Sequence, residues 1–248
     1  MEPAEREALE RRYQTAKRDA TSRGADGPLQ DFENAIAGSK AVIARSEGEV
    51  LRLATSTRQL YSTYYQQIEA GVRLPDGDAW DMLRELADTV LFPNYKKEMR
   101  FGALSWDGVG LSNYGSCSIV LRDELISYRT SVFEENSALF MERHDIKISR
   151  NPNLPKGYRA TWGDRAKLCV AKLSLRIDST TNSDKYSKLL LLKGATSKDD
   201  EFVEVHIWGP MTVLTMERVI VTAPQSSKRA TIIKAIRAKL AKHKVQVN

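Results

Sequence analysis

Residues 201–221 read EFVEVHIWGPMTVLTMERVIV, and this stretch sets the expected fold class. Apolar and polar residues alternate on both sides of Gly209 and Pro210, which predicts two strands, at 201–208 and 213–221. Further strands are predicted at 100–106, 115–122 and 168–177, with a short helix at 122–128. Because helices do not alternate with these strands, we expect an α+β fold with a mostly antiparallel sheet.

The strand at 201–208 has two chemically different faces. The core face carries Val203, Val205 and Ile207, and the other face carries Phe202, Glu204, His206 and Trp208. An acid, an imidazole and two aromatic rings are costly to bury for packing alone, so this second face suits the floor of a cleft that binds a ring and a sugar. The alternative is a sheet face turned to solvent, which would expose the two aromatic rings.

The N-terminal part has a different periodicity. Apolar residues recur in sevens between residues 29 and 71, which predicts long helices packed on a neighbour. The segment SRGADGP at 22–28 separates them from a charged first helix, and LPDGD at 74–78 precedes another helix. We therefore expect a helical region at 1–92 packed on a sheet domain at 93–224, followed by a basic helix at 225–248.

Composition excludes several classes of protein. The chain has 248 residues, 42% of them hydrophobic, but no apolar run long enough for a membrane span. The N-terminus lacks the features of a signal peptide, which predicts a cytoplasmic protein. Three histidines without CxxC, HxH or HExxH spacing predict no metal site, and no glycine-rich phosphate loop is present. The two cysteines lie in apolar runs, which is typical of buried free thiols.

The net charge of +6 is concentrated at the C-terminus. Residues 225–248 contain seven Lys and Arg and no acid, so residues 1–224 have a net charge of −1. The spacing predicts an amphipathic helix, capped by Ser226 or Ser227, that docks through three aliphatic residues, Ile233, Ile236 and Leu240. Its basic residues could contact nucleic acid or an acidic partner protein, or form a solvated face: Lys234, Arg237, Lys239 and Lys242.

Several short motifs, taken together and in order, resemble a family of bacterial and phage-associated proteins with the ADP-ribosyltransferase fold. The matching segments are YYQQIEAG at 64–71, RFGALS at 100–105, YGSC at 114–117 with VLR at 120–122, the pair Arg129-Thr130, and FVEVHIWGPMTVLTMERV at 202–219. The resemblance implies an ADP-ribosyltransferase-like split sheet and NAD as co-substrate. In the last segment, His206 and Trp208 stand where the family pattern has Gln and His.

The resemblance also implies roles for individual residues. Catalysis is expected from Glu204, Thr130 and Ser131, and contact with NAD from Arg100, Arg129, Tyr114, His206 and Trp208. Cleavage of the bond between nicotinamide and ribose creates an oxocarbenium-like centre, which a carboxylate stabilises. A guanidinium suits the pyrophosphate, and an aromatic ring stacks on nicotinamide.

Two features of the sequence bear on which molecule accepts ADP-ribose: a departure from the family pattern near Glu204 and the positive charge of the C-terminal segment. Relatives that modify arginine often carry Glu or Gln two residues before the catalytic glutamate, and Phe202 stands there. Together with the basic tail, this favours RNA or single-stranded DNA as the acceptor. We expect a toxin or phage-defence effector restrained by an antitoxin protein. The alternatives are a non-catalytic module that binds nucleic acid or a partner, and a phage structural protein.

Overall fold

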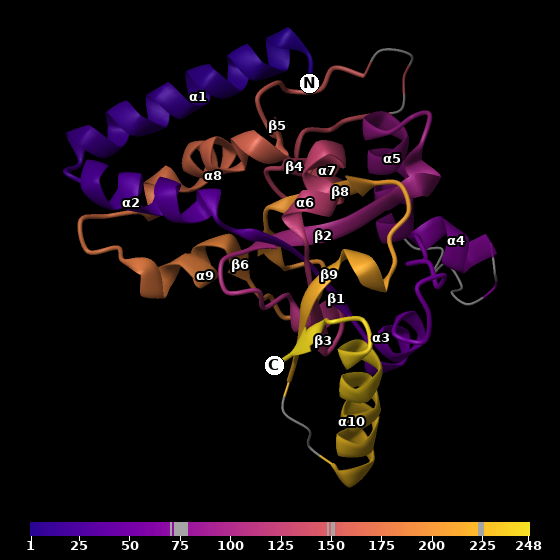
Figure 1. Ribbon diagram of the computed structural model, residues 1–248. Helices are drawn as coiled ribbons and strands as arrows, with labels where there is room; N and C mark the ends of the chain where they lie inside the picture. Colours follow the sequence, from indigo (N-terminus) through magenta and orange to yellow (C-terminus); the bar gives the residue numbers. More distant parts are fainter. Residues whose placement is uncertain (70, 72–78, 148, 150–151, 223–225) are drawn as a thin grey trace.

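The computed structural model describes residues 1–69, 71, 79–147, 149, 152–222 and 226–248 (Figure 1). The helices are α1 (Pro3–Ser22), α2 (Asp26–Ala37), α3 (Glu47–Leu53), α4 (Tyr64–Glu69), α5 (Ala79–Leu91), α6 (Asp123–Ile126), α7 (Ser137–Arg143), α8 (Arg165–Leu173), α9 (Tyr186–Leu190) and α10 (Ser227–Ala241). The strands are β1 (Lys40–Arg45), β2 (Met99–Ser105), β3 (Cys117–Leu121), β4 (Thr130–Phe133), β5 (Arg159–Thr161), β6 (Leu191–Leu192), β7 (Glu201–Phe202), β8 (Glu204–Trp208), β9 (Met216–Val221) and β10 (Gln246–Val247).

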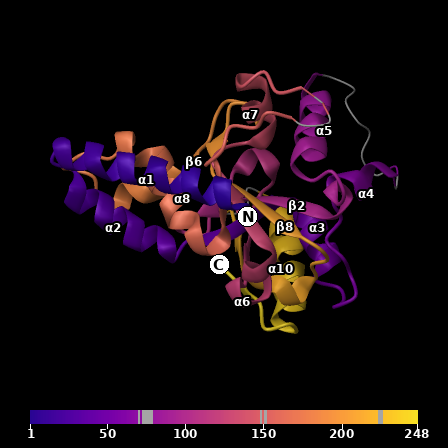
Figure 2. The same cartoon turned by 90° about the horizontal axis from the view of Figure 1, so that it is seen from above.

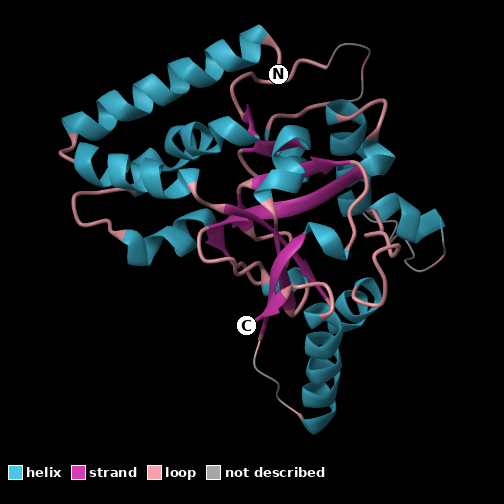
Figure 3. Cartoon of the chain, viewed as in Figure 1, coloured by secondary structure: helices cyan, strands magenta, loops and turns pink. Residues whose placement is uncertain are grey.

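One large, mostly antiparallel sheet organises the chain, as Figure 3 shows. Its strand order is β10-β9-β3-β1-β2-β8-β4-β5, while β6 and β7 form a separate pair. Neighbouring strands within the described residues run antiparallel, except that β10 is parallel to β9. The prediction of an α+β fold with a mostly antiparallel sheet is therefore confirmed.

The two faces of the sheet are covered differently. Val203, Val205 and Ile207 are fully buried, as their alternation predicts. This face packs toward the layer of α1, α2 and α8, while α5 and α7 lie on the other side of the sheet (Figures 1 and 2). The strand at 201–208 is interrupted at Val203, between β7 and β8. Residues 213–215 form a 3₁₀ turn before β9, so the second predicted strand is shorter than expected.

The predicted strand at 168–177 is wrong, because this segment forms α8 and a following 3₁₀ turn. The helix RAKLCVAKL consists mainly of good helix formers and buries Leu168, Cys169 and Leu173 together. The apparent alternation continues to Leu175, which is 75% exposed. Propensity and a helical burial pattern therefore outweigh the alternation. Both cysteines are buried free thiols, as expected.

The expectation of long helices rather than strands between residues 29 and 71 is also wrong. Between α2 and α3 the chain forms β1, a central strand paired with both β2 and β3. Residues 41–44 are all buried, and a strand covered on both faces has no polar positions to show its period. The region at 1–92 thus contributes a strand to the sheet. The break between α1 and α2 is confirmed, and α5 begins at Ala79; residues 74–78 lie outside the described residues.

The C-terminal helix forms as predicted. Ser226 caps α10 by accepting a hydrogen bond from the Arg229 backbone N–H at 3.3 Å. Ile233, Ile236 and Leu240 are buried, and α10 packs on α3. Across the described ranges, no helix combines the length and the apolar character needed to cross a bilayer.

Candidate functional site

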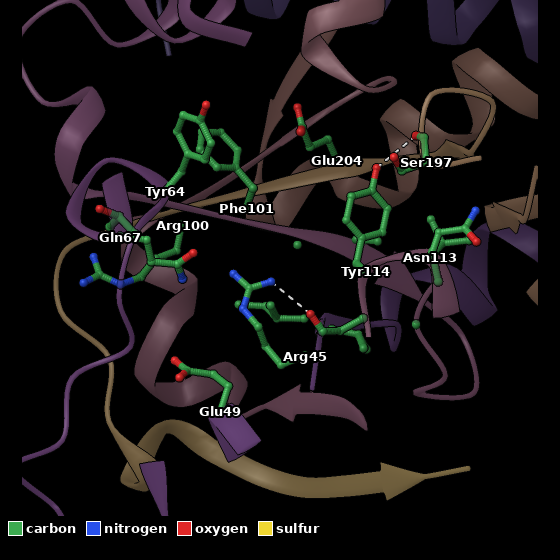
Figure 4. Close-up of a pocket in the computed structure, with 18 of the residues that line it drawn as sticks. Arg45, Glu49, Tyr64, Gln67, Arg100, Phe101, Asn113, Tyr114, Ser197 and Glu204 are labelled. Carbon is green, nitrogen blue, oxygen red and sulfur yellow. Dashed lines mark hydrogen bonds between the residues drawn. The ribbon is translucent and has the colours of Figure 1, made fainter. Parts of the chain in front are cut away.

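A cavity of about 830 Å³ is lined by residues of the neighbouring strands β1, β2 and β8. Three residues from adjacent strands share its wall at paired register positions: Val42 on β1, Ala103 on β2 and Glu204 on β8. Further lining residues come from α3, α4, α5, the segment around Tyr114 and the loop at 197–198 (Figure 4). Its volume lies within the range of cofactor and small-molecule sites.

The cavity brings together segments that are far apart in the sequence. Tyr64 and Gln67 come from YYQQIEAG, Phe101 from RFGALS, Tyr114 from YGSC, and Glu204 from the late strand. These are the segments that carry the resemblance stated above, except that VLR at 120–122 and the pair Arg129-Thr130 do not line the cavity. Figure 4 shows their side chains around one open space.

Glu204 is 2% exposed, and three groups hold its carboxylate. Arg84 Nη1 donates to Oε1 at 2.9 Å, and the backbone N–H of Ser137 donates to Oε2 at 2.9 Å. His206 Nε2 lies 2.9 Å from the same Oε2, so this nitrogen carries the proton of the hydrogen bond. The start of β8, the middle of α5 and the N-terminus of α7 therefore meet at one carboxylate.

Glu204 is ionised at neutral pH despite its burial. Burial alone raises the pKa, but the charge of Arg84 and the hydrogen bonds from His206 and Ser137 outweigh it and lower the pKa to about 2. A carboxylate offers about four acceptor positions, and three are used here. The carboxylate thus keeps acceptor capacity for a hydroxyl of a ligand in the cavity.

Thr130 and Ser131 do not line this cavity. Thr130 is buried, and its hydroxyl donates to the Ile126 carbonyl at 2.7 Å. Ser131 pairs with His206 in the register of β4 and β8, two register positions from the pair of Phe133 and Glu204. The structure therefore places Ser131 on the sheet face of Glu204 but does not bring its side chain to the cavity.

The two arginines that were predicted to contact NAD donate hydrogen bonds to backbone carbonyls. Arg100 is 4% exposed, and its guanidinium donates to the carbonyls of Tyr61, Glu98 and Gly209 at 2.7–3.1 Å. It contributes to the cavity wall. Arg129 lies outside the cavity, where it donates to Leu125, Trp208 and Pro210 carbonyls. In both cases the guanidinium links separate backbone segments through hydrogen bonds to their carbonyls.

The three predicted aromatic contacts occupy different places. Tyr114 lines the cavity, is 40% exposed, and donates from its hydroxyl to the Ser197 carbonyl at 3.2 Å. His206 is fully buried, with its ring centroid 4.9 Å from that of Phe92 and 5.4 Å from that of Phe101. Trp208 is half exposed and does not line the cavity. The predicted cleft floor therefore holds for Phe202 and Glu204 only.

Three arginines of the cavity escaped the sequence analysis: Arg45, Arg52 and Arg84. Arg84 resembles a surface residue paired with Asp88 at i+4, and nothing in the sequence reveals that α5 turns it toward Glu204. Arg45 ends β1; its Nη1 donates to the Ala44 carbonyl at 2.9 Å, and its guanidinium lies 4.8 Å from the Tyr61 ring centroid. Arg45 Nε is buried and finds no hydrogen-bond acceptor in the described part of the chain.

Glycine permits the close approach that places Arg45. Gly115 has φ +152°, and a Cβ there would lie 2.3 Å from the Arg45 carbonyl carbon. The glycine of YGSC thus lets the segment that carries Tyr114 pass directly over the end of β1. Gly102 of RFGALS plays a similar part, because a Cβ there would lie 2.7 Å from the Val42 carbonyl oxygen.

The basic residues of α10 lie away from the cavity lining. Lys234, Arg237 and Lys242 are exposed, and Lys239 is half-buried. The helix rests on α3, and Arg229 Nε donates to Glu47 at 2.7 Å. Because Glu49 and Arg52 of α3 line the cavity, α10 is separated from it by one helix.

The residues that the structure describes contain no cluster of His, Cys, Asp and Glu arranged to hold a metal ion. In comparisons with known proteins, no model of a protein family matches this chain, and no curated protein matches it.

Proposed function

We propose that this protein is an NAD-dependent ADP-ribosyltransferase whose sheet is of the ADP-ribosyltransferase-like split type, with Glu204 at the reacting ribose. The observation that carries this proposal is convergence: Tyr64, Phe101, Tyr114 and Glu204, from motif segments scattered over residues 64–219, line one cavity. An ionised carboxylate in that wall is the group that the chemistry requires.

The reaction needs negative charge beside the ribose. The bond between the nicotinamide nitrogen and the ribose C1′ breaks, nicotinamide leaves as a neutral molecule, and positive charge develops at C1′. Glu204 stabilises this charge and accepts a hydrogen bond from a ribose hydroxyl. An acceptor nucleophile then attacks C1′ and loses its proton, which yields the ADP-ribosylated acceptor, nicotinamide and H⁺.

Arg45 suits the pyrophosphate better than Arg100 or Arg129 does. Its Nε lacks an acceptor among the described residues, whereas Arg100 and Arg129 donate to several carbonyls. In Figure 4 it stands apart from Glu204, across the open space from it, with the Tyr114 ring at the right of that space. A guanidinium at one part of the cavity and a carboxylate at another match a ligand that has a diphosphate and a ribose.

The acceptor we propose is nucleic acid, with RNA favoured over single-stranded DNA. Exposed Lys234, Arg237 and Lys242 give α10 a positive surface without acidic residues, which attracts phosphates. Phe202, 5% exposed, lines the cavity where arginine-modifying relatives carry a polar residue. An enzyme with this activity damages the cell that makes it, so we propose a toxin or phage-defence effector with an antitoxin partner.

Transfer of label from NAD tests the proposal. Purified protein is incubated with NAD labelled in its ADP-ribose part and, separately, with RNA, single-stranded DNA or lysate protein. Glu204→Gln preserves size while removing the charge, and Glu201→Gln is the matched control, since Glu201 is exposed and pairs with Arg176 on the surface. We expect label on RNA with the wild type and with E201Q, and none with E204Q. Folded protein that binds RNA but neither cleaves NAD nor transfers label identifies the non-catalytic binding module instead.

A further inference from the structure

One guanidinium joins two buried carboxylates beside the cavity. Arg84 Nη1 donates to Glu204 Oε1 at 2.9 Å, while its Nε and Nη2 donate to Asp88 Oδ1 at 3.0 and 2.5 Å. Nη2 also donates to the Ser137 hydroxyl at 2.9 Å. Asp88 is fully buried, and Arg84 lines the cavity. All three guanidinium nitrogens therefore have fixed acceptors.

The surroundings of this cluster hold it further in place. The Arg84 guanidinium carbon lies 4.0 Å from the Phe101 ring centroid, and the Tyr65 hydroxyl donates to Asp88 Oδ2 at 2.9 Å. Residues of α4, α5, α7, β2 and β8 thus converge on one planar group. A rotation of Arg84 away from Glu204 would also break its contacts with Asp88 and Ser137.

The charge of the cluster explains why a second carboxylate is present. An isolated pair of Arg84 and Glu204 has no net charge, and a pair without net charge gives little electrostatic stabilisation to a developing positive charge. Asp88 brings the formal charge of the three groups to −1. Arg84 can therefore orient Glu204 while the cluster still favours a cation in the cavity.

The other groups around Glu204 do not replace Arg84. His206 contacts Oε2 from β8, Tyr114 lines the same cavity, and α7 contributes the backbone N–H of Ser137. The neighbours of Glu204 in register, Ala103 on β2 and Phe133 on β4, are uncharged. Of the described residues that contact the carboxylate, Arg84 carries the permanent positive charge.

We propose that Arg84 is a positioning residue for Glu204 and that Asp88 positions Arg84 in turn. Arg84 orients Oε1 in the cavity wall and keeps the carboxylate ionised, while Asp88 fixes the plane of the guanidinium. This inference rests on the proposed NAD chemistry at Glu204. It assigns a role to an ion pair that joins residues 120 positions apart in the chain.

Four variants test the inference through the pH profile of NAD hydrolysis. Arg84→Gln removes the charge, Arg84→Lys keeps the charge without the planar fork, and Asp88→Asn removes the second carboxylate. Arg176→Gln is the control, because Arg176 forms an exposed pair with Glu201. Turnover and KM for NAD are measured between pH 2 and 9, a range that includes the pKa of Glu204 in the wild type, with thermal unfolding as the check of the fold at each pH.

We expect R84Q to lower kcat about 100-fold with little change in KM, and to move the acidic limb of the profile up by about one pH unit. R84K should keep the acidic limb of the wild type and lose about tenfold in kcat, because a point charge cannot serve both carboxylates. D88N should also lose about tenfold. R176Q should match the wild type.

Three outcomes overturn the inference. R84Q with the kcat and pH profile of the wild type shows that Arg84 does not act on Glu204. A loss of kcat with an unmoved acidic limb shows a merely structural role. If R84Q does not fold, an R84K enzyme with the kcat of the wild type overturns the inference instead. A wild type that does not cleave NAD refutes the proposed function itself, whereas an active wild type with unaffected variants refutes only the role of Arg84.

Discussion

Arg84 and Glu204 form an ion pair, with 2.9 Å between Nη1 and Oε1, that joins the middle of α5 to the first residue of β8. Their side chains are 14% and 3% exposed. Two charges in such a place are costly to desolvate, and each depends on the other and on its further hydrogen bonds. The site and the stability of the fold are therefore coupled.

This coupling predicts a specific response to acid. The pKa of Glu204 is about 2 in the folded protein, below its ordinary value of 4.5, so the unfolded chain takes up the proton first as pH falls. The stabilisation that Glu204 supplies is complete above pH 4.5 and is lost as pH falls toward 2. Urea unfolding should show wild type and E204Q differing by about 1–3 kcal/mol more at pH 7 than at pH 3. Equal differences at the two pH values would contradict the low pKa.

Arg45 provides a test of the proposed diphosphate site. Arg45→Gln removes the charge and the far end of the side chain but keeps a polar, unbranched residue, so we expect NAD to bind about 10- to 100-fold more weakly, with kcat nearly unchanged. Calorimetric titration with NAD measures the change. Arg58→Gln is the control, because Arg58 is an exposed arginine that follows α3 without lining the cavity. Unchanged affinity in R45Q would place the diphosphate elsewhere.

Gly115 should tolerate no side chain. A Cβ at this position would lie 2.3 Å from the Arg45 carbonyl carbon and 2.5 Å from its oxygen, and backbone atoms cannot rotate away. Gly115→Ala should lower the free energy of unfolding by about 2 kcal/mol or more and weaken NAD binding, since Tyr114 and Arg45 both shift. Gly27→Ala in α2 is the control, because nothing lies within 4 Å of its added Cβ. A G115A midpoint in urea equal to that of the wild type would show that the loop adapts freely.

The sequence predicts much of this fold where one face of an element is polar. The alternation around Glu204 identifies β8 and its core face, and the caps and aliphatic spacing identify α10. Prediction fails at β1, because AVIA is buried on both faces and its apolar residues fit a helical repeat equally well. It fails at α8 because Cys169, Ala171 and Leu173, two positions apart, fit a strand period although the segment is a short helix.

The site is only partly predictable for a related reason. Glu204 and Tyr114 belong to recognisable motifs, and both line the cavity. Arg84 and Arg45 reach it only because the middle of α5 and the end of β1 meet at the same cavity, a tertiary arrangement without a local signal. Arg100 and Arg129 lie in or beside the motifs, yet in the structure their guanidinium groups donate hydrogen bonds to backbone carbonyls.

The basic surface of α10 supports a prediction about nucleic acid that does not depend on catalysis. Lys234→Gln, Arg237→Gln and Lys242→Gln together remove three exposed positive charges, and the buried face of the helix stays intact because Ile233, Ile236 and Leu240 are untouched. If each charge neutralises one phosphate, the slope of log K against log salt for single-stranded RNA should decrease by about 2. Anisotropy titrations of labelled RNA over a range of NaCl concentrations measure this slope. The control replaces three exposed arginines of α1, Arg6, Arg11 and Arg18, with Gln, which changes the net charge equally. A decrease in slope shared by both triple variants would show that net charge attracts the RNA, whereas a decrease confined to the α10 variant would place the RNA on this helix.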